Sequence, residues 1–180
     1  MDLYTIRKDR VSIDGVSIVL ANDLGRSRTI HSLAKALAQF DGVTVIAAGP
    51  QGARLPEDVR ARFRPPNALI ECTCTEDVSL IDVVKQYDPE FLYMTRPQKE
   101  RAGHPISTLC VDEQFLKEAP ENLKVMHPLP IDSKYFNEIT REALRDPRVI
   151  CFQQSDSGIP VRMAILGLWL KGTSEAVPAL

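Results

Sequence analysis

The stretch Gly15-Val16-Ser17-Ile18-Val19-Leu20 opens the pattern that decides the fold. It is a short apolar run entered through a glycine, which is typical of a buried β-strand. Apolar residues then recur at helical spacing, at Ile30, Leu33, Ala34, Leu37 and Ala38. Gly42 ends this helix, and a second apolar run follows at once. The stretch therefore predicts one strand-helix-strand unit.

The same alternation continues outward to both ends of the chain. The expected strands after the first are 43–47, 68–72, 90–94, 124–126 and a last short one at 149–152. The expected helices are 56–63, 80–84, 112–117, 133–144 and one from Pro160, with the end of another at 1–8. Repeated units of this kind predict an α/β fold, a Rossmann-like parallel sheet of about five strands with helices on both faces. We expect a single domain at 1–172 and a flexible tail at 173–180.

The composition excludes several classes of function. The 180 residues carry a net charge of −2 without a Lys/Arg block, so nucleic-acid binding is not expected. The longest apolar run, 163–170, is too short to span a membrane, and no signal peptide is visible, so we expect a cytoplasmic protein. Four cysteines lack zinc-ligand spacing and are expected to be free, buried thiols: Cys72, Cys74, Cys110 and Cys151. We predict neither a metal nor a cofactor.

Three arginines stand where they do not favour stability. Arg28 falls in the first turn of the first long helix, Arg162 in the first turn of the last helix, and Arg96 just past a strand. A cation at a helix N-terminus costs about 0.3–1 kcal/mol. In a parallel sheet these positions meet at one edge, where a ligand with two carboxylates would match the guanidinium groups. The alternative is ordinary salt bridges to Asp23, Glu100 or Asp156.

Two further segments bear on a binding site. The loop His127-Pro128-Leu129-Pro130 follows a strand, and its prolines fix the backbone and remove two donors. Its carbonyl groups could accept hydrogen bonds from a ligand ammonium group, and a rigid strand-to-helix turn explains the loop equally well. The segment 22–28 contains a single glycine, which disfavours a dinucleotide site.

Three phrases, in order, resemble a known family. They are Asp-Leu at 23–24 with Arg-Thr-Ile-His-Ser-Leu at 28–33, Tyr-Met-Thr-Arg-Pro-Gln-Lys-Glu-Arg at 93–101, and Met-His-Pro-Leu-Pro at 126–130. Together with Gly158 and Arg-Met-Ala at 162–164, they resemble aspartate carbamoyltransferase over the chain up to about residue 171. That family transfers a carbamoyl group from carbamoyl phosphate to L-aspartate at the start of pyrimidine biosynthesis. The resemblance covers only its C-terminal, aspartate-binding domain.

The resemblance also implies roles for individual residues. The implied substrate-binding residues are Arg28, Arg96, Gln98, Leu129, Pro130 and Arg162. Among them, Arg28, Arg96 and Gln98 would hold the aspartate carboxylates, and Leu129 and Pro130 would offer backbone carbonyls. The implied supporting residues are Asp23, His127, Lys99, Glu100 and Arg101. No residue of the chain is assigned as catalytic.

The chain departs from the family in two loops. Ile131-Asp132-Ser133 replace the usual phrase of an arginine and an acidic pair, and Asn22 replaces the glycine before Asp-Leu. The carbamoyl-phosphate phrases, Ser-Thr-Arg-Thr and His-Pro-x-Gln, do not occur in these residues. We therefore expect an aspartate-binding half, inactive alone, whose partners are L-aspartate or a similar dicarboxylate and a carbamoyl-phosphate-binding domain or subunit. The alternatives are a catalytically inactive amino-acid-binding or regulatory protein, and a relative in fold alone that binds another dicarboxylate or phosphate.

Overall fold

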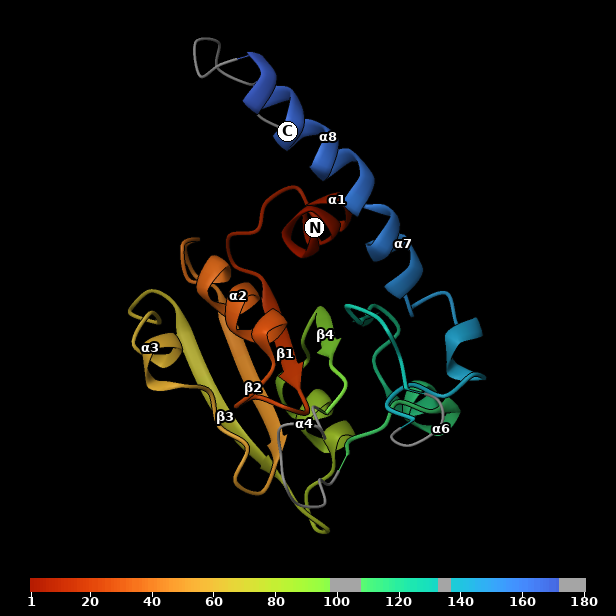
Figure 1. Ribbon diagram of the computed structural model, residues 1–180. Helices are drawn as coiled ribbons and strands as arrows, with labels where there is room; N and C mark the ends of the chain where they lie inside the picture. Colours follow the sequence, from red (N-terminus) through yellow and green to blue (C-terminus); the bar gives the residue numbers. More distant parts are fainter. Residues whose placement is uncertain (98–107, 133–136, 172–180) are drawn as a thin grey trace.

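A five-stranded parallel sheet forms the centre of the protein (Figure 1). The structure is a computed structural model that describes residues 1–97, 108–132 and 137–171. The sheet has the order β3-β2-β1-β4-β5, which confirms the predicted α/β architecture. Its strands are β1 (Ser17–Ala21), β2 (Thr44–Pro50), β3 (Ala68–Cys74), β4 (Phe91–Met94) and β5 (Lys124–Met126). The tail predicted at 173–180 lies outside the described residues.

Alternating side chains of the strands supply two apolar clusters, one on each face of the sheet. In β1, Val19 and Ala21 pack in one cluster, whereas Ile18 and Leu20 pack in the other. This is the period of two that a strand buried on both faces requires. Helices α1 (Asp2–Asp9), α2 (Arg28–Leu37) and α3 (Glu57–Arg60) contribute to the cluster of Ile18. Helices α4 (Leu80–Tyr87) and α6 (Glu113–Glu118) contribute to the cluster of Val19.

The region after β5 differs from the prediction. The strand expected at 149–152 is wrong, because Val149 makes only a single bridge to Val125 and helix α7 (Cys151–Asp156) begins two residues later. The helix expected at 133–144 is wrong for its described part. Ile139 is drawn into a bridge with Val111, and only a 3-10 turn, η1 (Ala143–Arg145), follows. These long-range backbone pairings override the local helical pattern.

Helix α1 is fastened to the sheet through the carboxylate of Asp2. One oxygen of Asp2 accepts a hydrogen bond from the Tyr93 hydroxyl at 3.0 Å, and the other accepts one from Gln154 Nε2 at 2.9 Å. Burial, together with the nearby Asp2 charge, raises the pKa of Tyr93. The carboxylate thus joins α1, β4 and α7 at one point, and the helix expected at the start of the chain is confirmed.

Helix α8 (Gly158–Lys171) runs away from the sheet, beyond α1 and α7 (Figure 1). Its apolar side chains are exposed, and Trp169 reaches 87 % exposure. A helix that is apolar on all sides is normally buried in the assembled protein. Among the described residues, no helix is long and apolar enough to cross a membrane.

The cysteines correct one expectation. All four are free, but only Cys74 and Cys151 are buried. Cys72 is half-buried, on the edge strand β3, which has a neighbour on one side only. Cys110 is exposed because it lies in a loop, where its thiol contacts the Asn137 carbonyl at 3.0 Å.

Candidate functional site

Three strand-end loops meet at one edge of the sheet. Strand β1 lies between β2 and β4, and β4 lies between β1 and β5. The register pairs Ala21 with Met94 and Tyr93 with Met126, so that these neighbouring strands end at nearly the same level. The loops that leave them carry 22–28, 95–97 and 127–132. The expectation that Arg28 and Arg96 stand at the carboxyl edge of a parallel sheet is therefore confirmed at the level of their loops.

Arg28 is the first residue of α2 and is exposed. The helix begins there because the Ser27 hydroxyl accepts a hydrogen bond from the Ile30 N–H, which satisfies one free donor of the first turn. Asp23, one of the carboxylates expected as an ion-pair partner, accepts the Arg26 N–H at 3.2 Å and lies 3.8 Å from Arg26 Nη1. Within the described part of the chain, Arg28 forms no ion pair with any carboxylate. Its guanidinium is therefore available to a ligand.

Arg96 follows β4 after Thr95 and is half-buried. Thr95 is buried, and its hydroxyl donates a hydrogen bond to the Ala21 carbonyl at 3.1 Å. This contact ties the start of the Arg96 loop to the end of β1. The other predicted residues of this phrase, Gln98, Lys99, Glu100 and Arg101, lie outside the described residues.

Two side chains, one from α7 and one from the loop itself, accept hydrogen bonds from backbone N–H groups of the loop at 127–132. The His127 N–H donates to Gln154 Oε1 at 2.8 Å, and His127 Nδ1 accepts the Leu129 N–H at 3.0 Å. Leu129 has a φ of 52°, in the left-handed region that few side chains adopt. Leu129 is half-buried and Pro130 is exposed, so the loop can be reached from solvent. A strained conformation with internal support is typical of a loop that presents backbone groups.

The buried carboxylate of Glu138 also supports this loop, and the sequence analysis does not predict this role. Its side chain is 0 % exposed, Oε1 accepts the Asp132 N–H at 3.0 Å, and the same oxygen lies 3.2 Å from His127 Nε2. Because Nδ1 of His127 accepts a hydrogen bond, the neutral ring carries its proton on Nε2, facing this carboxylate. Burial would raise the pKa of Glu138, but the contacts with His127 and the Asp132 N–H outweigh it and hold that pKa below its usual value.

Arg162 comes from a different part of the fold. Helix α8 begins at Gly158 rather than at Pro160, so Arg162 lies in its second turn instead of the first. The exposed guanidinium folds back over Gly158: a Cβ built there would stand 2.8 Å from Arg162 Nη1 and 3.2 Å from the sulfur of Met1. No contact in the described part of the chain joins Arg162 to Arg28 or Arg96. Its role in binding stays a prediction.

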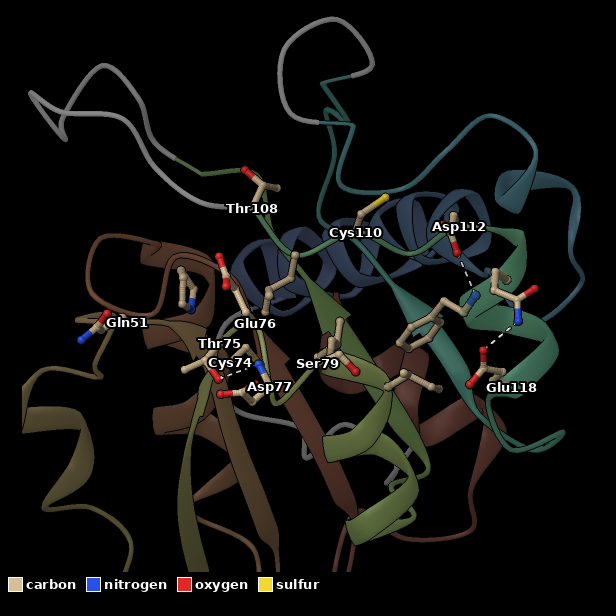
Figure 2. A pocket seen from close by; sticks show the side chains of 16 residues that line it. Gln51, Cys74, Thr75, Glu76, Asp77, Ser79, Thr108, Cys110, Asp112 and Glu118 are labelled. Atoms are coloured by element: carbon tan, nitrogen blue, oxygen red, sulfur yellow. Dashed lines mark hydrogen bonds between the residues drawn. The ribbon is translucent and has the colours of Figure 1, made fainter.

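A separate pocket of about 820 Å³ lies beside the ends of β2 and β3 (Figure 2). Figure 2 shows Asp77, Asp112 and Glu118 around it, and Glu76 completes the set of carboxylates. Among the described residues, no lysine or arginine lines it. Two of these carboxylates accept hydrogen bonds from other residues that line the pocket. Asp112 accepts one from the Phe115 N–H at 2.8 Å, and Glu118 accepts one from Gln114 Nε2 at 2.7 Å. The described lining is unfavourable for a ligand with two carboxylates and contains neither Arg28 nor Arg96, so this pocket is distinct from the strand-end region of those arginines.

Comparison with known proteins agrees with this geometry. Residues 14–169 match the family model "Aspartate/ornithine carbamoyltransferase, Asp/Orn binding domain". The aspartate carbamoyltransferase catalytic subunit of Thermococcus onnurineus is 39 % identical over 94 % of this chain and 53 % of that protein. The corresponding subunit of Methanococcoides burtonii is 37 % identical over 93 % of this chain and 53 % of its own. The chain thus spans about half the length of these relatives.

Solved structures give the same result. The catalytic subunit of M. jannaschii aspartate transcarbamoylase superposes with a TM-score of 0.74 at 32 % identity, covering 97 % of this chain and 55 % of that one. The aspartate transcarbamoylase of Trypanosoma cruzi, solved in complex with aspartate and phosphate, gives a TM-score of 0.74 at 32 % identity, over 92 % of this chain and 50 % of that one. The fold, the motifs and the extent of the match agree: the chain belongs to the aspartate/ornithine carbamoyltransferase family and corresponds to its Asp/Orn binding domain.

Proposed function

We propose that this protein is the aspartate-binding half of an aspartate carbamoyltransferase. With a separate carbamoyl-phosphate-binding half, it would convert carbamoyl phosphate and L-aspartate into N-carbamoyl-L-aspartate, a step of cytoplasmic pyrimidine biosynthesis. Alone it would be inactive, because transfer requires the carbamoyl donor to be held beside the aspartate amine. The fixed donors that meet the charge developing on the carbonyl oxygen would come from the other half.

One observation carries the proposal: Arg28, at the start of α2, and Arg96 both follow the carboxyl ends of adjacent strands, β1 and β4. An exposed arginine at the start of α2 opposes the helix dipole, which a bound carboxylate would compensate. Arginine binds carboxylates in a bidentate manner, so two such residues suit a ligand with two carboxylates. The Trypanosoma cruzi relative solved with aspartate adds support for this ligand.

The Leu129–Pro130 loop would receive the amino group. It leaves β5, which lies next to β4, and its backbone is held by His127 and Glu138. Carbonyl oxygens of such a loop can accept N–H bonds and orient the amine towards the carbamoyl carbon. Gln98 would add a contact to the carboxylates, with Lys99, Glu100 and Arg101 supporting the same phrase and Arg162 assisting.

The need for a partner half is supported by α8. Its exposed apolar side chains include Leu166, Trp169 and Leu170, at the end of a helix that leaves the sheet. Exposed apolar surface of this extent is characteristic of an interface. Because the chain spans about half of its relatives, we propose that the carbamoyl-phosphate-binding half covers this helix.

A second candidate is a catalytically inactive amino-acid-binding or regulatory protein. The observation in its favour is the sequence after Pro130, where Ile131 and Asp132 replace the family's arginine-containing phrase. Ile131 is uncharged and packs against the apolar cluster beside α4 and α6. The positive charge of the family's arginine is therefore missing from this phrase. This protein would bind aspartate without supporting transfer.

One experiment separates the two candidates. Purified protein is titrated with aspartate, and carbamoyl-aspartate formation is assayed alone and with the carbamoyl-phosphate half of a relative. Activity that appears only with the added half supports the first candidate, and binding without activity supports the second. Arg96→Ala should abolish the binding, whereas Arg26→Ala, in the same strand-end region, should leave it nearly unchanged. Loss of binding in both variants would point to a general effect of positive charge and would contradict the assigned role of Arg96.

A further inference from the structure

Asn22 has an unusual conformation for its residue type. It follows β1 directly and has a φ of 83°, in the region that glycine adopts without strain. Asparagine tolerates this region better than most residues, but it still pays a steric cost there. Its polar side chain is only 1 % exposed. A buried amide in a place suited to glycine calls for hydrogen bonds that compensate it.

The side-chain amide of Asn22 supplies such bonds to two distant segments. Its Nδ2 donates to the Thr95 carbonyl at 3.0 Å and to the Leu109 carbonyl at 3.2 Å. Its Oδ1 accepts the Leu109 N–H at 2.7 Å. Both amide hydrogens and the amide oxygen are therefore engaged. Towards Leu109, the amide makes the pair of bonds that a neighbouring backbone would make.

The backbone of Asn22 is fixed as firmly as its side chain. Its N–H donates to the Ala48 carbonyl of β2 at 3.2 Å, and its carbonyl accepts the Leu24 N–H at 2.9 Å. Gly49 leaves room for this backbone, because a Cβ at its position would lie only 3.2 Å from the Asn22 carbonyl oxygen. Asn22 is thus a junction where the ends of β1 and β2, the start of the Arg96 loop and Leu109 are joined.

We propose that Asn22 is a positioning residue for the amino-acid ligand. By holding Thr95, it fixes the root of Arg96 relative to β1, whose loop leads to Arg28. In this chain, where the amide stands in place of the family's glycine, it fixes the separation of the two arginines and thereby strengthens the preference for a ligand carrying two carboxylates. The inference rests on the proposed function for its ligand, but the anchoring of Leu109 by Asn22 can be measured without any ligand.

The test compares Asn22→Gly with the unaltered protein. Glycine adopts the positive φ freely, so the backbone is retained while the three side-chain bonds are lost. Aspartate and alanine are titrated in the presence of the carbamoyl-phosphate half of a relative. The preference for aspartate should fall on the order of tenfold, because the loss of roughly one hydrogen bond's stabilisation frees the root of Arg96. Hydrogen exchange at the Leu109 amide should become faster by a similar factor of roughly ten.

Asn22→Asp divides the two contacts. A carboxylate keeps an oxygen to accept the Leu109 N–H but has no donor for the Thr95 carbonyl or the Leu109 carbonyl. Exchange at the Leu109 amide should therefore stay slower than in Asn22→Gly, while the preference for aspartate falls. If Asn22→Asp instead lost the exchange protection at Leu109 and kept the preference for aspartate, the contact with Thr95 would not control the ligand preference, and the proposal would be contradicted.

Asn67→Ala provides a matched control at the opposite edge of the sheet. Asn67 also joins two segments through its amide, accepting the Val43 N–H at 2.9 Å and donating to the Ala38 carbonyl at 3.3 Å. Its loss should lower the melting temperature without changing the preference for aspartate. An equal loss of preference in this variant would reduce the effect of Asn22 to general stability and overturn the proposal.

Two remaining outcomes are also decisive. If Asn22→Gly changes neither the preference nor the exchange at Leu109, Asn22 has no positioning role. If the unaltered protein binds no aspartate even with the added half, the proposed function is wrong and the ligand role of Asn22 falls with it. Faster exchange at Leu109 in Asn22→Gly would then still establish Asn22 as the anchor of this junction.

Discussion

At the scale of single residues, Glu138 determines the shape of the loop that we assign to the ligand amine. Its carboxylate contacts both ends of the loop, His127 at the start and the Asp132 N–H near the end. His127 in turn accepts the Leu129 N–H, at the residue with positive φ. One buried charge therefore acts through a side chain and a backbone group on the same short segment.

This arrangement predicts an acid-dependent loss of stability. Because the pKa of Glu138 is lowered in the folded protein, its carboxylate stabilises the fold above its unfolded pKa of about 4.3. That contribution is lost as the pH falls through the lower, folded value. Glu138→Gln keeps the shape but not the charge, and should reduce the free energy of unfolding at pH 7 by about 1–2 kcal/mol. Urea denaturation across the acid range measures this.

The exposed Glu142 offers the matched variant, since Glu142→Gln removes a carboxylate from the same stretch of chain. It should change the free energy of unfolding by less than about 0.5 kcal/mol at any pH. A Glu138→Gln protein whose acid unfolding follows that of the unaltered chain would show that the buried carboxylate does not contribute as assigned.

The sequence could identify some of these residues and not others, for physical reasons. Arg28 and Arg96 were recognisable because a cation at a helix start or a strand end is unfavourable within its own element. Glu138 carries no such signal, and Asn22 differs only in standing where the family has glycine. Asn22 bonds to Leu109, which is 87 positions away, so its role exists only after the sheet has brought the two segments together. Side-chain to backbone contacts of that range cannot be inferred from local pattern.

At the scale of elements, the sequence predicts β1, β2, β4 and β5 well because each is a short apolar run buried on both faces, whereas the edge strand β3 is more exposed. It failed between β5 and α7, where Ile139 and Val149 each form a single bridge instead of a helix or strand. Local propensity is a weak prior when tertiary pairing competes with it. Arg28 lies in the first turn of α2, as predicted, and the Ser27 side chain caps that turn.

The first turn of α2 predicts opposite effects on stability and binding. Arg28→Ala removes a cation from the positive end of the helix dipole, which should raise the free energy of unfolding by about 0.3–1 kcal/mol. The same change should weaken aspartate binding by roughly 10- to 100-fold, the range of a charge-assisted hydrogen bond. Thermal unfolding and calorimetric titration with the added half measure the two effects on one sample.

Lys35→Ala tests the specificity of this result on the same helix. Lys35 lies in the last turn of α2 and pairs with Asp58. Its loss should lower stability slightly and leave aspartate binding unchanged. If Arg28→Ala instead lowered stability and kept its affinity, Arg28 would be a structural residue and the electrostatic reading of its position would be wrong.

At the scale of the whole molecule, the described residues divide into a well-packed sheet and a helix without cover. The sheet has apolar clusters on both faces, whereas α8 exposes Ile159, Met163, Leu166 and Trp169. The sequence predicts this final helix but does not indicate that it leaves the sheet. Apolar residues indicate that a helix is buried, but they do not identify the surface against which it packs. The relatives are nearly twice as long, and we propose that the half corresponding to their remaining length provides the surface that covers α8.

Changing Leu166 and Trp169 together to glutamate should prevent assembly with the carbamoyl-phosphate half of a relative. Both side chains are exposed, at 60 % and 87 %, so the substitution should not disturb the packed sheet. Burying two carboxylates in an apolar interface costs several kcal/mol, on the order of a thousandfold in affinity. Sedimentation of the mixed halves would then show free components, while circular dichroism of the variant stays native.

Val11→Glu alters another highly exposed apolar side chain, 91 % exposed and before β1, and should leave assembly intact. Normal assembly of the double variant would mean that the partner half binds elsewhere and that α8 requires a different cover.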